Sequence, residues 1–339
     1  MRVLVTGGAG YIGSHTLLEL MAGNHDVCVF DSYINSSPVV LDRVRSLSNG
    51  QVRAEQGDIR DDQTLSHVMD DFRPDAVIHF AGLKAVGDSM KRPLDYYDVN
   101  LRGTMGVLRA MDAVGCKRMI FSSSATVYGD PVYLPYDEAH PLNPTNVYGR
   151  SKLLSEQVIT DWAELTGGTG VLLRYFNPVG AHPSARIGED PEGIPDNLMP
   201  YVAQVAIGKR DRLSVFGNDY DTPDGTGLRD YIHVVDLARA HVAALDYAAT
   251  AKGARPFNIG TGQSYSVLEM IAAFAAASGR DIPYDIAPRR AGDIAAMQAD
   301  ASRAAKDLGW VASFGLADMA QSTWDWQRAN PQGFEGAVG

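Results

Sequence analysis

The chain has 339 residues, of which 45% are hydrophobic and 21% are charged, and its formal net charge is −11. This composition is that of a globular protein, and it excludes a disordered or fibrous chain. The acidic balance opposes non-specific binding to nucleic acid or to anionic membranes. No apolar run approaches the ~18 residues that span a bilayer. A strand at residues 3–6 leaves no room for a signal peptide, so we expect a cytoplasmic protein.

Short β-branched runs alternate with longer helical stretches through the first half of the chain, which is typical of a parallel sheet covered by helices on both faces. Regular alternation weakens in the turn-rich segment that follows Tyr175, and we place a domain boundary near residue 178. The buried strands that we expect are 3–6, 27–31, 76–79, 119–122 and 171–174, and the later helices are 197–207, one from about 233, 267–277 and 316–328.

The sequence therefore predicts an α/β fold, with a doubly wound (Rossmann) parallel sheet and a smaller α/β substrate-binding lobe. We expect residues 1–178 to form the first domain and residues 179–339 to form mainly the smaller lobe, with some segments that return to the first domain.

A glycine-rich turn follows the first strand and opens a helix over residues 14–21, with glycines at Gly7, Gly10 and Gly13. Such glycines let the chain turn tightly and let a pyrophosphate approach the backbone, while the helix N-terminus offers unpaired N–H groups to the anion. The second strand ends in Asp31, where an acid accepts hydrogen bonds from ribose hydroxyls. A 2′-phosphate would meet a like charge there, so the pattern favours NAD over NADP.

Tyr148 and Lys152 are four residues apart and share one face of a predicted helix. A free phenol has a pKa of about 10, and a positive charge ~5–6 Å away favours the phenolate. We therefore expect Lys152 to lower the pKa of Tyr148, which would then act as a base. A Tyr-x-x-x-Lys pair is common by itself, and its meaning depends on the other motifs.

Four motifs of the chain resemble those of the extended short-chain dehydrogenases/reductases. The glycine turn matches that of the superfamily, and the catalytic set there is a serine, a Tyr-x-x-x-Lys pair and often an asparagine. Phe121 to Gly129 lies where the serine is expected, and Ser124 aligns with the catalytic hydroxyl. Asn100 begins the matching asparagine segment.

Longer segments are similar to the UDP-glucose 4-epimerase family, namely 79–87, 173–182, 188–201 and 216–233, and the resemblance runs from residue 2 to about 333. It implies that NAD held in the enzyme takes hydride from C4 of UDP-galactose or UDP-glucose, giving a 4-keto sugar and NADH. The keto sugar turns and receives hydride on its other face. Tyr148 would be the base at O4, with Lys152 and the nicotinamide charge beside it, and Ser124 would hydrogen-bond O4.

The resemblance also carries over the ligand sets. The expected cofactor-binding residues are Gly7, Gly10, Tyr11, Ile12, Gly13, Asp31, Asn35, Ser36, Asp58, Ile59, Phe80, Ala81, Gly82, Lys84, Asn100, Ser122, Tyr148, Lys152 and Tyr175. The expected substrate-binding residues are Ser124, Asn177, Asn197, Leu198, Phe216, Arg229, Arg290, Asp293 and Met297. Two arginines suit a diphosphate, because guanidinium groups bind phosphate oxygens with charge-assisted bonds.

Several alternatives bear on this interpretation. A 4,6-dehydratase would need an acid pair where this chain has Ala125 and Thr126, so elimination is disfavoured. A regulator that only senses NAD would have lost the tyrosine, lysine or serine. Epimerases of UDP-N-acetylhexosamines or UDP-pentoses stay open, since Met297 has a flexible side chain on the C2 side of the sugar. We expect no metal site and no nucleic-acid partner, and the family resemblance implies a homodimer built from helices near 92–112 and 151–165.

Overall fold

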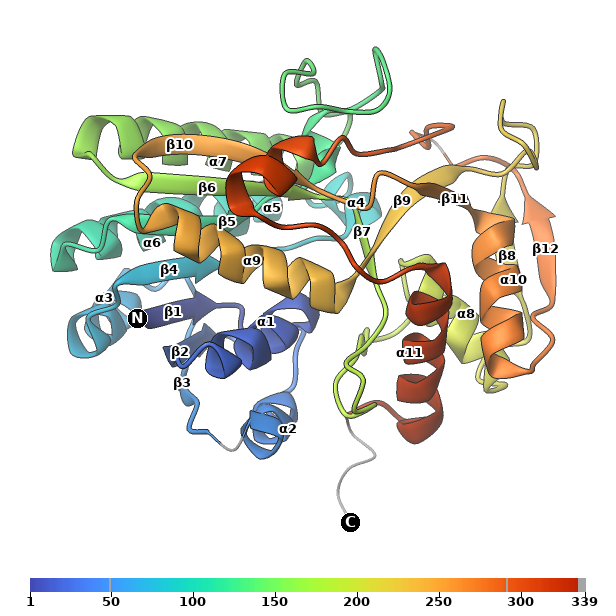
Figure 1. Ribbon diagram of the computed structural model, residues 1–339, viewed down its shortest axis with the longest axis horizontal. Coiled ribbons are helices and arrows are strands. Elements are labelled where there is room, and N and C mark those ends of the chain that lie inside the picture. Colours follow the sequence, from blue (N-terminus) through green and yellow to red (C-terminus); the bar gives the residue numbers. More distant parts are fainter. Residues whose placement is uncertain (49, 291, 335–339) are drawn as a thin grey trace.

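The computed structural model describes residues 1–48, 50–290 and 292–334, and a seven-stranded sheet dominates it (Figure 1). The strand order is β10-β6-β5-β4-β1-β2-β3, and every pairing in this sheet is parallel. The strands are β1 (Arg2–Thr6), β2 (Asp26–Asp31), β3 (Arg53–Gln56), β4 (Ala76–His79), β5 (Arg118–Ser122), β6 (Thr169–Tyr175) and β10 (Gly253–Ile259). The order reverses between β1 and β4, as in a doubly wound fold, so the predicted fold class is confirmed.

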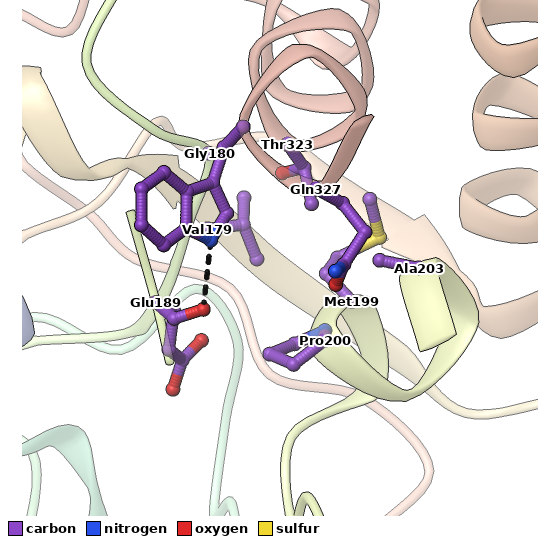
Figure 2. A pocket seen from close by; sticks show the side chains of 9 residues that line it. Val179, Gly180, Glu189, Met199, Pro200, Ala203, Thr323 and Gln327 are labelled. Atoms are coloured by element: carbon purple, nitrogen blue, oxygen red, sulfur yellow. Dashed lines mark hydrogen bonds between the residues drawn. The ribbon is translucent and has the colours of Figure 1, made fainter. Parts of the chain in front are cut away.

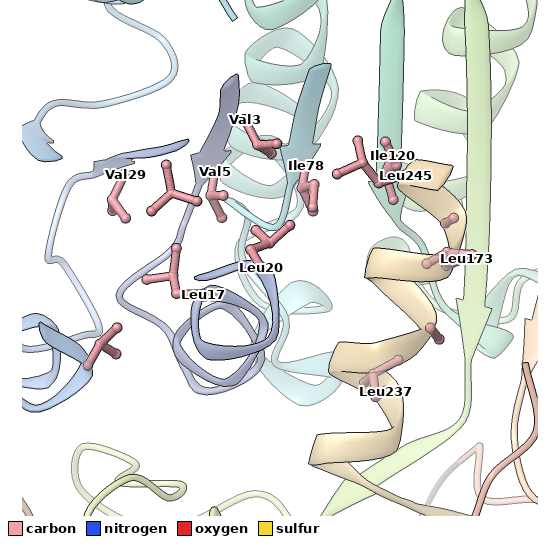
Figure 3. Packing of buried hydrophobic residues seen from close by; sticks show 14 of the residues in the cluster. Val3, Val5, Leu17, Leu20, Val29, Ile78, Ile120, Leu173, Leu237 and Leu245 are labelled. Atoms are coloured by element: carbon pink, nitrogen blue, oxygen red, sulfur yellow. The ribbon is translucent and has the colours of Figure 1, made fainter. Parts of the chain in front are cut away.

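Helices cover both faces of this sheet, because its strands are buried on both sides. One face packs on α1 (Tyr11–Ala22), α2 (Val39–Ser48) and α9 (Val234–Ala248). The other face packs on α3 (Asp62–Phe72), α6 (Gly103–Val114) and α7 (Val147–Thr166). Side chains alternate accordingly along β1, where Val3 and Val5 join the first cluster and Leu4 joins the second. Figure 3 shows Leu17 and Leu237 in the first cluster.

The smaller lobe has its own core and two small sheets (Figure 1). One sheet has the order β11-β9-β7, from β7 (Asn177–Val179), β9 (Leu228–His233) and β11 (Ser264–Ser266), and the other pairs β8 (Leu213–Phe216) with β12 (Tyr284–Ala287). The helices are α8 (Leu198–Ala206), α10 (Val267–Ser278) and α11 (Leu316–Ala329). Ser266 and Glu269 form a capping box that fixes the start of α10.

Short helical elements complete the chain around the sheet. They are α4 (Val86–Ser89), α5 (Pro93–Tyr96), a π-helix η1 (Tyr97–Arg102), a 3-10 turn η2 (Ala125–Val127) and a second π-helix η3 (Ala304–Leu308). None of the helices in the described part of the chain is long and apolar enough to cross a membrane.

All five predicted strands are present, but β3 and β10 were missed in the large sheet. β3 has the sequence Arg-Ala-Glu-Gln, which is not an apolar run, and Pro256 lies inside β10. β10 tolerates a proline because it lies at the edge of the sheet, where one side of the strand makes no ladder hydrogen bonds. The chain thus enters the smaller lobe after β6 and returns to the large sheet through α9 and β10.

Candidate active site

The glycine turn lies between β1 and α1, and its shape depends on the absence of side chains. Gly7 has φ +71°, and a Cβ there would lie 2.6 Å from the Ala81 amide nitrogen. A Cβ on Gly13 would lie 2.5 Å from the Gly7 carbonyl oxygen. No side chain caps α1 at Gly10, so the first N–H groups of the helix stay available to an anion. The turn therefore fits the pyrophosphate of a dinucleotide.

Asp31 joins the end of β2 to this turn. Its Oδ2 accepts a hydrogen bond from the Ala9 amide at 2.9 Å, and its Oδ1 accepts from the Tyr33 amide at 2.9 Å and the Ser36 hydroxyl at 3.1 Å. A carboxylate has about four acceptor sites, so capacity for a ribose hydroxyl remains. Asn35, in the same loop, is exposed. The residues at this end of β2 fit the adenosine ribose of NAD.

Tyr148 and Lys152 lie on α7 and meet Ser124, which follows β5. The Tyr148 hydroxyl is hydrogen-bonded to the hydroxyls of Ser124 and Tyr175. Lys152 Nζ lies 6.0 Å from the centre of the Tyr148 ring. The exposed fractions of Tyr148, Lys152 and Ser124 are only 6%, 5% and 7%. The structure thus brings together the three residues that the sequence assigned to catalysis.

The electrostatics of Tyr148 differ from the sequence-based expectation. Burial raises the pKa of the Tyr148 phenol well above its ordinary value, and the neighbouring Tyr175 raises it further, while the hydrogen bond with Ser124 acts in the opposite direction. The sequence-based prediction considered the charges of Lys152 and of the nicotinamide but not burial, and among the protein's own residues burial has the largest effect on this pKa. The desolvation of a buried phenolate outweighs the attraction of one nearby ammonium.

Lys152 is held at the bottom of this site by a backbone contact. Its Nζ donates a hydrogen bond to the Ser122 carbonyl oxygen at 2.8 Å and lies 4.7 Å from the centre of the Phe121 ring. Burial lowers the pKa of Lys152 to about 8, and the charge of Glu156 opposes that shift. The ammonium form of Lys152 therefore predominates at neutral pH.

Asn100 lies in the π-helix η1 and binds the loop after β4. Its Oδ1 accepts a hydrogen bond from the Leu83 amide at 2.8 Å, and its Nδ2 donates to the Leu83 carbonyl at 3.0 Å and to Ser151 Oγ at 2.9 Å. A Cβ on Gly82 would lie 2.9 Å from Asn100 Oδ1. Asn100 therefore holds the loop beside Lys152 in place, and direct contact with the cofactor stays a prediction.

The other predicted cofactor residues border the same end of the sheet. The Tyr11 hydroxyl donates to the Gly180 carbonyl at 2.6 Å, and the Asp58 carboxylate accepts from the Arg60 guanidinium at 2.6 Å. The ring centres of Phe80 and His241 lie 4.6 Å apart. Three of the remaining residues lie next to these, namely Ile12 in the first turn of α1, Ile59 in the loop after β3 and Ala81 in the loop after β4.

Glu189 connects a predicted cofactor residue to a predicted substrate residue. Its Oε1 accepts hydrogen bonds from Lys84 Nζ at 3.2 Å and from Asn197 Nδ2 at 2.8 Å. Its side chain is only 9% exposed, and it borders a small cavity with Met199 and Gln327 (Figure 2). Sequence reasoning missed Glu189, because nothing in its local pattern pointed to two partners so far apart in the chain.

The predicted UDP-binding residues gather in the smaller lobe, around the ends of β7, β8 and β9. The Arg290 guanidinium lies 3.9 Å from the centre of the Phe216 ring. Arg229 Nη2 lies 3.9 Å from the Asp293 carboxylate, and Arg229 Nη1 donates to the Leu228 carbonyl at 2.9 Å. The remaining members of this set are Asn177 at the start of β7, Leu198 at the start of α8, and Met297, whose amide donates to the Leu228 carbonyl at 3.0 Å.

Comparison with known proteins identifies the family. A model of the NAD dependent epimerase/dehydratase family matches residues 3–260, so the chain belongs to that family. UDP-glucose 4-epimerase of Mus musculus is 55% identical over 98% of both chains. The crystal structure of UDP-glucose 4-epimerase from Bifidobacterium longum in complex with NAD⁺ and UDP is 53% identical, with a TM-score of 0.95 over 98% of this chain and 100% of that chain.

A third relative was solved with both kinds of ligand. UDP-glucose-4-epimerase from Stenotrophomonas maltophila, with bound NAD and formylated UDP-arabinopyranose, is 49% identical, with a TM-score of 0.96 over 98% of this chain and 99% of that chain. The family inferred from the sequence is confirmed, and so is NAD as the cofactor of an NAD-dependent epimerase.

Proposed function

We propose that this protein is a UDP-glucose 4-epimerase, which interconverts UDP-galactose and UDP-glucose by inverting C4 of the sugar. The observation that carries the proposal is the buried cluster of Tyr148, Lys152 and Ser124 beside a turn that fits a dinucleotide. The relatives named above are UDP-glucose 4-epimerases that match over almost their whole length, and they favour this substrate over N-acetylated or pentose UDP-sugars.

In the proposed reaction Tyr148 is the proton acceptor and donor at O4. Hydride leaves an alcohol carbon only as the O–H proton departs, so a base is required at that oxygen. NAD, when bound, accepts the hydride and returns it, and its nicotinamide carries a positive charge. Because burial raises the pKa of Tyr148, the Lys152 ammonium alone does not make the phenol a base, and a second positive charge near the ring favours the phenolate.

Ser124 holds O4 against Tyr148. Its hydroxyl already hydrogen-bonds the Tyr148 phenol, so a substrate hydroxyl between the two contacts both groups. Ser124 Oγ also accepts hydrogen bonds from the Thr126 amide at 3.2 Å and the Thr126 hydroxyl at 3.0 Å, which restrict its rotation. Tyr175, which also hydrogen-bonds Tyr148, flanks the nicotinamide.

Arg229 and Arg290 bind the diphosphate of the substrate, and Phe216 and Asp293 help to position them. The Arg229–Asp293 and Arg290–Phe216 contacts support this assignment, because each arginine already has a neighbour that orients its guanidinium. The two lobes therefore bind different ligands. Residues 1–178, with α9 and β10, bind NAD, and the rest of the chain from 179 mainly binds the UDP-sugar.

The active protein is a cytoplasmic homodimer whose interface includes helices near 92–112 and 151–165. Leu94, Leu154 and Leu165 support this interface, since they are 78%, 37% and 86% exposed. Apolar side chains that gather on a surface mark association sites more often than single exposed leucines do. Light scattering on the purified protein tests the dimer.

A turnover assay without added oxidant tests the proposed reaction. Because the cofactor is restored in every cycle, the purified protein should retain NAD and convert UDP-galactose to UDP-glucose in the absence of free NAD. Accumulation of free NADH in proportion to product would contradict epimerisation. UDP-N-acetylglucosamine assayed beside UDP-galactose measures the preference between the two sugars.

A further inference from the structure

Three successive turns of α7 contact three successive serines that follow strand β5. Tyr148 is hydrogen-bonded to Ser124, and Lys152 donates to the Ser122 carbonyl oxygen at 2.8 Å. The third contact joins Glu156 and Ser123, whose hydroxyl donates to Glu156 Oε1 at 2.5 Å. Residues 148, 152 and 156 are spaced by four, so they lie on one face of the helix. Only the first two of these contacts belong to the proposed chemistry.

Glu156 is also half of a buried ion pair. Arg174 Nη2 lies 2.6 Å from Glu156 Oε2, and Arg174 Nε donates to both carboxylate oxygens, at 3.0 and 3.2 Å. Both side chains are 4% exposed. A buried carboxylate with a bidentate guanidinium partner is ionised and fixed in orientation. Ser123 therefore donates to an acceptor that cannot rotate away.

We propose that Glu156 is a positioning residue of the epimerase site, which holds Ser123 and thereby sets the Ser124 hydroxyl against Tyr148. The inference rests on the proposed function. Ser124 is the residue next to Ser123 and starts the 3-10 turn η2, so the Ser123–Glu156 bond fixes the backbone from which the Ser124 hydroxyl projects. A displacement of about 1 Å in a catalytic group is enough to lower turnover. Loss of the hydrogen bond at Ser123 would let Ser124 move, and turnover would therefore fall.

Glu156 has a second effect through its charge, because it is one helical turn from Lys152. The groups that face Lys152 are Glu156 and Tyr148 on α7 and His79 on β4. Burial lowers the pKa of His79 to about 3, so that ring is neutral. Arg174, on β6, donates to the Glu156 carboxylate at 2.6 Å. The negative charge of Glu156 therefore favours the ammonium form of Lys152, with Arg174 partly offsetting it.

The variant Glu156→Gln tests both effects, since the amide keeps the shape of the side chain and removes its charge. We expect kcat to fall about tenfold to a hundredfold with KM within about threefold of the parent. Lys152 then loses its proton at lower pH, so the alkaline limb of the kcat–pH profile moves to lower pH. Asp211→Asn, which also replaces a carboxylate by its amide but at an exposed position before β8, is the matched control and should leave both readouts unchanged.

Glu156→Gln leaves the Arg174 charge buried without its partner, and this loss of stability could prevent the variant from folding. A second variant avoids this problem. Ser123→Ala leaves the ion pair intact and removes only the hydrogen bond to Glu156. We expect about a tenfold loss of kcat, an unchanged KM and an unchanged alkaline limb. Ser278→Ala, at the end of α10 in the smaller lobe, is its control.

The outcomes separate this inference from the proposed function. If the parent protein does not epimerise UDP-galactose, the proposed function fails before any variant is compared. If the parent is active and Ser123→Ala keeps parental kcat, the positioning role of Glu156 is overturned. If Glu156→Gln lowers the melting temperature but keeps kcat and the alkaline limb, Glu156 is structural only, which also overturns the inference.

Discussion

The proposed catalytic half of the site is buried, whereas its proposed UDP-binding half lies nearer the surface. Tyr148, Lys152 and Ser124 are at most 7% exposed. In the smaller lobe the Arg229 side chain is 18% exposed, its partner Asp293 is 35% exposed, and Arg290 is exposed. The two halves therefore face different physical requirements at the moment of binding.

This difference indicates which side chains are already ordered before the substrate binds. Groups that act on the reacting carbon are fixed by packing and hydrogen bonds before the substrate arrives, which is how preorganised sites stabilise a transition state. Arginines that are only partly held by a neighbour lose their remaining rotamer freedom when they bind a phosphate, at a cost of about 0.5–1.5 kcal/mol for each side chain that is immobilised. Substitutions in the first half should change kcat, and those in the second should change KM.

Tyr148→Phe tests the buried half most severely. The variant keeps the ring but has no hydroxyl to exchange a proton with O4, so kcat should fall by about a hundredfold to ten thousandfold. Binding of UDP, measured by calorimetry, should stay nearly unchanged, because the diphosphate contacts are in the other lobe. Turnover close to that of the parent would remove Tyr148 from the proposed mechanism.

Lys152→Met tests how the Lys152 charge affects the pKa of Tyr148 in the buried half of the site. The base acts in its deprotonated form, so activity rises as the pH passes the pKa of Tyr148. Removal of a nearby cation raises that pKa, and the rising limb of the pH–rate profile should move to higher pH by about one to three units. An unchanged profile would show that the Lys152 charge has no influence on the base.

Arg290→Ala tests the exposed half. Loss of charge-assisted bonds worth about 1.5–3 kcal/mol should raise KM for UDP-galactose roughly tenfold to a hundredfold, with a smaller change in kcat. Arg289→Ala is the matched control, because the Arg289 guanidinium is paired with Asp219 at 2.7 Å and lies 4.1 Å from the Tyr220 ring centre. Equal effects of the two substitutions would argue against a specific role for Arg290.

Arg212→Ala should have the smallest effect, since it removes an exposed ion pair outside the site. Arg212 and Asp285 are 56% and 58% exposed and join β8 to β12 at 2.9 Å. Solvent-exposed pairs contribute about 0–1 kcal/mol, so denaturant unfolding should show a loss within that range and kcat should not change. A larger loss of stability would mean that the smaller lobe depends on its surface ion pairs.

The sequence predicted the parts of this molecule whose signal is local. The turn at Gly7 and the pair Tyr148 and Lys152 each lie within a few residues, so their spacing alone carries the pattern. Strand β10 was missed because it contains Pro256 and pairs with a strand far earlier in the chain. The raised pKa of Tyr148 depends on burial, which spacing does not report.

The late return of the chain to the large sheet has a consequence for synthesis. Strand β10 ends at Ile259, and α9 covers the face of the sheet that includes Ile120 and Leu173. A nascent chain therefore cannot finish its first lobe when residue 178 emerges from the ribosome. When β10 has been made, β7, α8, β8 and β9 of the smaller lobe precede it in the chain, and α10, β12 and α11 are still to come. An unfinished chain therefore exposes apolar surface that chaperones would have to protect.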